Sequence, residues 1–282
     1  MSASDPLIGV LVSFCWFHFR TLTYYASAPL IKLSHTGTET RKVDRPQNWK
    51  DAGESGWAPP VYDSDQQRRA VQKDFLTKVY GILAAQLLLT CVLCAIFMFV
   101  EPVTMFAYGN LWFTIVLFII NIVLIVTLFF VKNNYPWNFY LLGAFTIAMG
   151  CMIATTCAVY AVHGMGHIVA LAAGATLFVF VSLTIFVQLS DIDFSFLGLF
   201  LPVCLLVFII WMCIAIIFGF SLGMLFGALG VLLFSGFIIY DTWMIMNRMG
   251  CDDYIIASIE LYLDVINVFS MMMLLFSGGD MG

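Results

Sequence analysis

The chain has 282 residues, of which 62% are hydrophobic and only 10% are charged, with a net charge of −5. A soluble domain carries about 25% charged residues and needs a polar shell around its core. This composition excludes a soluble enzyme, a disordered chain and a secreted disulfide scaffold, and it predicts an integral membrane protein without a basic patch for nucleic acid.

The charges divide the chain into two parts, because ten of its twelve Lys and Arg residues precede Val79. We expect a polar N-terminal tail over residues 1–67, a membrane domain over 68–276 and a short C-terminal tail over 277–282. Within the first tail, residues 36–65 are rich in polar residues, Gly and Pro and are predicted to be disordered. The apolar run 7–19 is too short to span a bilayer, which leaves an interfacial segment or a wrongly assigned chain start.

Seven apolar runs in the second part are long enough to cross a bilayer, which requires about 20 residues. They cover residues 79–100, 111–131, 137–162, 168–190, 194–220, 222–240 and 254–276. The connections between them are short, so neighbouring helices must be antiparallel. The predicted fold is an all-α membrane protein, a seven-transmembrane-helix bundle whose last helix is central or re-entrant.

Basic residues flank only one set of span ends, and such residues mark the cytosolic side of a membrane protein. They are Arg68, Arg69, Lys73 and Lys78 before the first span, Lys132 after the second and Arg248 after the sixth. The N-terminus is therefore predicted to be cytosolic. Seven full crossings place the C-terminus on the opposite side, whereas a re-entrant last segment returns it to the cytosol.

Two small-residue patterns inside the spans are interpreted as packing. Cys91 and Cys94 form a Cys-x-x-Cys motif, which indicates redox or metal chemistry in a soluble protein but two small buried hydrophobes in an apolar helix. Gly219, Gly223 and Gly227 recur every four residues, which is typical of a helix face that lets a neighbouring helix approach closely.

Three acidic residues occur at membrane depth, where each carboxylate costs roughly 2.5–3.5 kcal/mol to insert. They are Asp241, Glu260 and Asp264. Asp241 precedes Arg248 by seven residues and Asp264 follows Asp253 by eleven, which places them about 10 Å and 16 Å from the same loop. We therefore expect Asp241 and Asp264 to meet on consecutive antiparallel helices.

Two neighbouring carboxyl groups in a low dielectric share one proton more easily than they both ionise. Such a pair can act as a pH sensor, a proton relay, a cation site or a protease dyad. Glu260 and Asn267 share one face of the last helix with Asp264. Because calcium takes six to eight oxygen ligands, these residues predict only weak calcium binding at Asp241 and Asp264.

The alternative is that each acid is protonated or paired with a base at a helix end, for which Lys132 and Arg248 are the candidates.

Several segments resemble a known family. Phe-Ile-Ile-Tyr-Asp-Thr at 237–242 and Leu-Tyr-Leu-Asp-Val-Ile-Asn-Val-Phe at 261–269 resemble the signature segments of the transmembrane BAX inhibitor motif family. Phe-Leu-Thr-Lys-Val-Tyr at 75–80 and Gln-Leu-Leu-Leu-Thr at 86–90 are similar to its Lifeguard and Golgi anti-apoptotic protein branch. Asn-Phe-Tyr-Leu-Leu at 138–142, followed by Phe145 and Thr146, adds to the resemblance.

The resemblance implies a pH-sensitive calcium leak channel that lowers stored calcium and suppresses cell death, with Asp241 and Asp264 as its proton sensor and gate. It implies a Golgi or ER membrane, or another intracellular membrane. The expected partners are membrane lipid, calcium, protons and apoptosis-regulating membrane proteins. Calcium is the transported ion, and neither a cofactor nor a catalytic residue is expected.

The chain also departs from the family pattern. Some members carry a glutamate in the second span and an arginine eleven residues later, which align with Asn121 and Lys132. Asn121 is therefore kept as a candidate for the ion pathway, together with Glu260 and Asn267. Glu260 stands where many members have a small or polar residue, so it adds a carboxylate.

Other functions fit less well. An intramembrane aspartyl protease should read Gly-x-Gly-Asp in its second motif, whereas residues 261–264 read Leu-Tyr-Leu-Asp. A retinal pump requires a lysine in the seventh span, which this chain lacks. An anti-apoptotic scaffold without transport stays open, although it leaves the buried acids unexplained.

Overall fold

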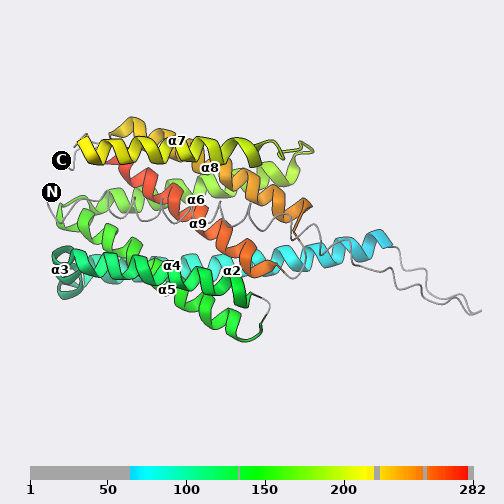
Figure 1. The fold of residues 1–282 in the computed structure, drawn as a ribbon, viewed down its shortest axis with the longest axis horizontal. Coiled ribbons are helices and arrows are strands. Elements are labelled where there is room, and N and C mark those ends of the chain that lie inside the picture. The colour runs from blue at the N-terminus through cyan, green and yellow to red at the C-terminus, as the bar shows by residue number, and fades with distance from the viewer. Residues whose placement is uncertain (1–63, 133, 219–222, 250–252, 279–282) are drawn as a thin grey trace, which may run out of the picture.

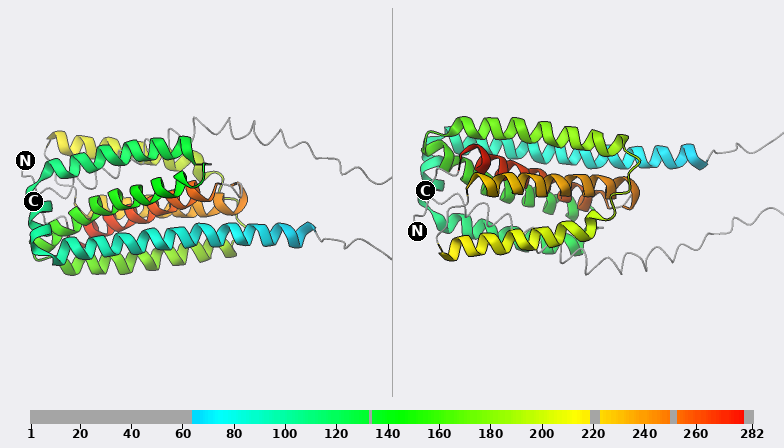
Figure 2. Two further views of the ribbon diagram at one scale, coloured as in Figure 1. Left: turned by 90° about the horizontal axis from the view of Figure 1, so that it is seen from below. Right: turned by 90° about the horizontal axis from the view of Figure 1, so that it is seen from above.

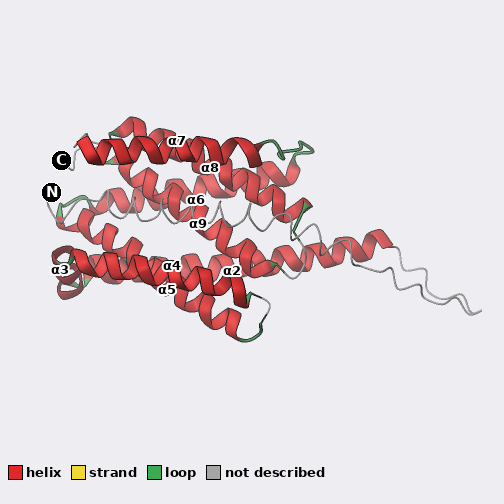
Figure 3. Cartoon of the chain, viewed as in Figure 1, coloured by secondary structure: helices red, strands yellow, loops and turns green. Residues whose placement is uncertain are grey.

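The computed structural model describes residues 64–132, 134–218, 223–249 and 253–278. The described residues form helices joined by short loops and turns, and no strand occurs among them (Figure 3). The helices are α2 (Ser64–Phe99), α3 (Glu101–Gly109), α4 (Leu111–Val131), α5 (Trp137–Val162), α6 (Gly166–Leu189), α7 (Leu197–Phe218), α8 (Met224–Asn247) and α9 (Tyr254–Phe276). The apolar run 7–19 and the predicted disorder of 36–65 lie outside the described residues, except that residues 64 and 65 begin α2.

Seven of these helices are long and apolar enough to cross a membrane, as predicted. For α4, α5 and α9 the predicted and observed ends coincide. The short helix α3 was not predicted, because residues 101–109 lie between the first two predicted spans. Its sequence carries the usual start signals, an acidic Glu101 in the first turn followed by Pro102.

Two other helices are longer than predicted. α2 begins at Ser64 rather than at residue 79, and its first turns project beyond the ends of the other helices (Figure 1). Hydropathy detects only the apolar part of a helix, so these polar turns were not predicted to be helical. α8 continues to Asn247 rather than ending at residue 240, so that Asp241 lies inside the helix and not at its end.

The last helix, α9, is the central helix of the bundle. Every residue from Ala257 to Leu274 is buried, and α9 packs against α8, α2, α6 and α5. Figures 1 and 2 show it running obliquely between the α7–α8 layer and the α2–α4–α5 layer. Its 23 residues span about 35 Å, enough to cross the hydrocarbon core of about 30 Å. The structure therefore supports the central alternative over the re-entrant one.

The outer helices present apolar side chains to their surroundings. Phe178 on α6 and Leu199 and Ile217 on α7 are each about three-quarters exposed. A water-soluble protein rarely exposes apolar patches of this extent. The surface is therefore that of a bundle surrounded by lipid.

Basic side chains gather at one end of the bundle. Lys73 and Lys78 lie near the start of α2, Lys132 follows α4, and Arg248 follows α8. The Lys78 ammonium group lies 5.9 Å from the centre of the Tyr254 ring at the start of α9. The C-terminal end of α9 lies at the opposite end of the bundle (Figure 1).

Candidate functional site

The three acidic residues singled out from the sequence all lie in the protein interior. Asp241 is 4% exposed on α8, and Glu260 and Asp264 on α9 are 6% and 0% exposed. α8 and α9 follow each other in the chain as antiparallel helices and form one of the two most extensive helix pairings in the bundle. Both aspartates thus lie in the half of this pair that is nearer the basic end.

Gly227 lets α8 and α9 approach closely, as predicted, whereas a Cβ at Gly223 would meet no atom within 4 Å, and Gly219 lies outside the described residues. A Cβ atom on Gly227 would lie only 2.8 Å from the Leu275 backbone nitrogen and 3.2 Å from the Met271 carbonyl oxygen. At Gly230 a Cβ would overlap the Met271 side chain. Only a residue without a side chain fits at Gly227, because its neighbours there are backbone atoms.

Two buried amides were predicted as candidates for the ion pathway. Asn267 lies on α9 two turns after Glu260, and Asn121 lies on α4; each is 1% exposed. Asn121 donates from Nδ2 to the Leu117 carbonyl oxygen at 2.9 Å. Within the described ranges the Oδ1 atoms of Asn267 and Asn121 have no hydrogen-bond partner. α4 packs mainly on α5, so Asn121 lies on a different helix pair from Asp241 and Asp264.

A hydrogen-bond network beside Asp264 was not singled out from the sequence. The Tyr262 hydroxyl lies 2.8 Å from Thr90 Oγ1, and Thr90 Oγ1 donates to the Gln86 carbonyl oxygen at 2.9 Å. Gln86 Nε2 donates to Thr146 Oγ1 at 3.0 Å. The network ties α2 and α5 to α9, two residues from Asp264. The sequence feature that could have revealed this network is the pair Gln86 and Thr90, two polar residues one turn apart inside an apolar helix.

We expect Tyr262→Phe to destabilise the fold by about 1 kcal/mol, because a buried hydrogen bond is lost with little change in shape. Thermal unfolding of the purified protein in detergent measures the effect. Tyr140→Phe is the matched control, because Tyr140 is 68% exposed. Equal melting temperatures for the two variants would contradict the assignment of this bond.

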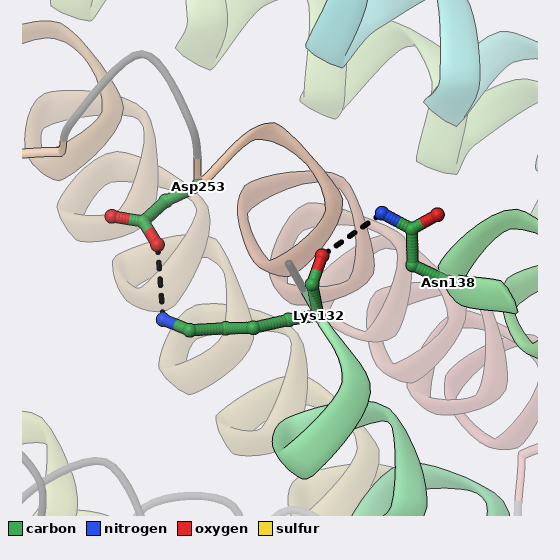
Figure 4. Close-up of polar contacts among 3 residues, drawn as sticks. All are labelled: Lys132, Asn138 and Asp253. Carbon is green, nitrogen blue, oxygen red and sulfur yellow. Dashed lines mark hydrogen bonds and ion pairs between the residues drawn. The ribbon is translucent and has the colours of Figure 1, made fainter. Parts of the chain in front are cut away.

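The bases that sequence offered as partners of the aspartates lie near helix ends. Lys132 Nζ lies 3.0 Å from Asp253 Oδ1, and the Lys132 carbonyl oxygen accepts from Asn138 Nδ2 at 2.9 Å (Figure 4). This ion pair ties the end of α4 to the residue that precedes α9. The Arg248 guanidinium lies over the Trp243 ring, 5.3 Å from its centre.

The Lys132–Asp253 pair should contribute little to stability, because its side chains are 28% and 29% exposed. A double-mutant cycle with Lys132→Met and Asp253→Asn should give a coupling energy of about 0.2–1 kcal/mol. Repeating the cycle at high salt should reduce this coupling, because ions screen exposed charges. A coupling that salt leaves unchanged would mean that the pair is shielded from solvent.

No group of three or more His, Cys, Asp or Glu side chains in the described part of the chain is arranged to hold a metal ion.

The chain is similar to proteins of a known family. A family model described as "Inhibitor of apoptosis-promoting Bax1" matches residues 72–280, which cover all seven long apolar helices. The chain belongs to this Bax1-inhibitor family.

Several relatives support membership in the Bax1-inhibitor family. The chain is 33% identical to Protein LIFEGUARD 4 of Arabidopsis thaliana, over 85% of the chain and 97% of the relative. It is 33% identical to Protein lifeguard 3 of Homo sapiens, over 72% and 68%. It is 34% identical to the Golgi anti-apoptotic protein of Vaccinia virus (strain Lister), over 71% and 83%. The family resemblance read from the sequence is therefore confirmed.

The segments that resembled the family supply several of the buried polar residues. Asp241 and Asp264 belong to the two signature segments. The Tyr262–Thr90 and Gln86–Thr146 hydrogen bonds also join residues of the resembling segments. In an apolar bundle these residues form a polar centre around α9.

Proposed function

We propose that this protein is a pH-sensitive calcium leak channel of an intracellular membrane, in which Asp241 and Asp264 form the proton sensor and gate. The observation that carries the proposal is the burial of both carboxyl groups on the packed pair α8 and α9. Carboxyl groups at membrane depth are costly and mark ion or proton pathways. By lowering stored calcium, the channel suppresses cell death.

Calcium requires several oxygen ligands, and the interior offers more than the two aspartates. Glu260 lies one turn before Asp264 on α9, and the Asn267 Oδ1 atom one turn after it has no hydrogen-bond partner among the described residues. The described residues hold no group of three such carboxyl groups arranged around one ion, whereas a tight calcium site needs six to eight oxygen ligands. A weak site is what conduction requires, because the ion must leave as well as enter.

The proposal also includes the orientation of the protein in the membrane and the membrane in which it lies. Lys73, Lys78, Lys132 and Arg248 lie at one end of the bundle, which the positive-inside rule assigns to the cytosol. The start of α2 is then cytosolic and the end of α9 faces the lumen. The name of the viral relative, Golgi anti-apoptotic protein, supports a Golgi membrane, with the ER as the alternative.

The test is calcium flux into liposomes that contain the purified protein and a trapped calcium dye, measured at pH 6 and pH 8. We expect a flux above that of protein-free liposomes, with a rate that differs between the two pH values. Absence of flux at both pH values, from protein shown to be folded, would overturn the proposal.

The second candidate is an anti-apoptotic membrane scaffold that transports nothing. The name of the viral relative favours this candidate, because "anti-apoptotic" describes a cellular outcome and names no transported ion. A scaffold protects cells equally well with or without its buried carboxyl groups. If Asp241→Asn and Asp264→Asn both protect cells as the unchanged protein does, the scaffold is favoured over the channel.

A further inference from the structure

Two thiols from different helices lie side by side in the bundle. The Sγ atoms of Cys94 on α2 and Cys157 on α5 are 3.7 Å apart, and both cysteines are free. Cys157 is fully buried, whereas Cys94 is partly exposed. The polar centre around α9 does not use either thiol.

This pairing corrects the interpretation of Cys91 and Cys94 as two buried hydrophobes. Cys91 is exposed on the outer surface of α2, so the Cys-x-x-Cys spacing does not bring the two side chains to one interior position. Cys94 instead lies beside Cys157, 63 residues later in the chain.

The two cysteines lie at the same depth. Cys94 precedes the end of α2 at Phe99 by five residues, and Cys157 precedes the end of α5 at Val162 by five. At 1.5 Å per residue both lie about 8 Å from the end of the bundle opposite Lys132. This end faces the lumen in the orientation proposed above, and secretory compartments favour disulfides.

The two sulfur atoms are already close to bonding distance. A disulfide has an S–S length of about 2.05 Å, so the sulfur atoms must approach by about 1.7 Å. Cys94 packs against a cluster that contains Ala154 and Ala158 beside the larger Phe97. Rotation of the side chains about their Cα–Cβ bonds changes sulfur positions by more than this distance.

We propose that Cys94 and Cys157 form a redox-active dithiol, which hydrogen peroxide oxidises to a disulfide that ties α2 to α5. The Cys94 sulfur attacks one peroxide oxygen, the O–O bond breaks, and a sulfenic acid and one water form. The Cys157 sulfur then displaces the hydroxyl group of the sulfenic acid, the S–S bond forms, and a second water leaves. Two thiol protons end in the two waters, and the peroxide is reduced by two electrons.

The bond would act on the helices that hold α9. Both α2 and α5 contact α9, and the Thr90–Tyr262 hydrogen bond joins α2 to it directly. A covalent link between α2 and α5 limits their relative movement around the helix that carries Asp264. The proposed oxidation of the two thiols does not depend on the calcium leak. An effect of the disulfide on calcium flux, by contrast, rests on the proposed function.

The test is treatment of the full-length protein in detergent with hydrogen peroxide, followed by thiol counting with a maleimide and peptide mapping by mass spectrometry. We expect the loss of two free thiols, a linked peptide that joins Cys94 to Cys157, and full reversal by a reductant. Cys94→Ser and Cys157→Ser should each abolish the link. Cys204→Ser and Cys213→Ser on α7 are the matched controls and should leave it unchanged.

Three outcomes would overturn the proposal. Peroxide could leave both thiols unreacted, oxidise them separately to sulfinic acids, or link Cys94 to Cys91 or Cys151 instead. Mapping of the unchanged protein needs no variant, so a folding defect in a serine variant does not decide the result.

Discussion

Replacing Asp264 with Asn should abolish the pH response of calcium flux, so that the ratio of rates at pH 6 and pH 8 falls to about one. Asn keeps the shape of the side chain but cannot release a proton in this pH range. Asp264 is fully buried on the central helix, so a change in its charge acts on the helices packed around it. Asp241→Asn should have the same effect if the two carboxyl groups act as the proposed pair, because such a pair needs both of them.

The control for this experiment is a carboxyl group outside the bundle. Asp191 lies exposed between α6 and α7, so Asp191→Asn removes a charge and leaves the interior unchanged. Its pH profile should match that of the unchanged protein. If Asp264→Asn and Asp241→Asn both keep the original pH profile while remaining folded, the gating assignment is wrong.

Glu260 differs from the two aspartates in its expected role. It lies one turn from Asp264 and is buried, and the proposed function assigns it to the ion pathway rather than to the proton-sharing pair. Glu260→Gln should therefore lower the rate at both pH values while the ratio between them persists. Measuring rate and ratio separately distinguishes a residue that binds the ion from one that senses protons.

The spans could be predicted from the sequence because lipid imposes a simple requirement. Backbone groups in a bilayer must be paired within a helix, so an apolar run of about 20 residues identifies a crossing. The ends of α2 and α8 were wrong for the same reason, since hydropathy reports lipid contact and not helix formation. Ser64 to Lys78 and Asp241 to Asn247 are polar or mixed, yet they continue the helices.

The site could be predicted only in part. Asp241, Glu260 and Asp264 stood out because a single charged group is conspicuous in an apolar run. The Tyr262–Thr90 bond did not, because hydroxyl groups are common in membrane helices and the sequence does not tell which helices are neighbours. The Lys132–Asp253 and Cys94–Cys157 contacts were missed for the same reason, since each joins residues more than 60 positions apart.

Replacing Gly227 with Ala should destabilise the bundle by about 1–3 kcal/mol and lower its melting temperature by about 2–10 °C. The added Cβ would lie 2.8 Å from the Leu275 nitrogen and 3.0 Å from its Cα. These are backbone atoms, so relief requires α8 to move away from α9. The same methyl group at Gly230 meets the flexible Met271 side chain, so Gly230→Ala should cost less.

Gly174→Ala on α6 separates this packing effect from helix propensity. A Cβ at Gly174 would have no atom within 4 Å, so the control gains the helix preference of Ala over Gly without a clash. It should therefore leave the melting temperature unchanged or raise it. A fall for Gly227→Ala beside a rise for Gly174→Ala would show that α8 and α9 are held at backbone contact. Because Asp241 and Asp264 lie on these two helices, Gly227→Ala should also weaken the pH response of flux, which Gly174→Ala should preserve.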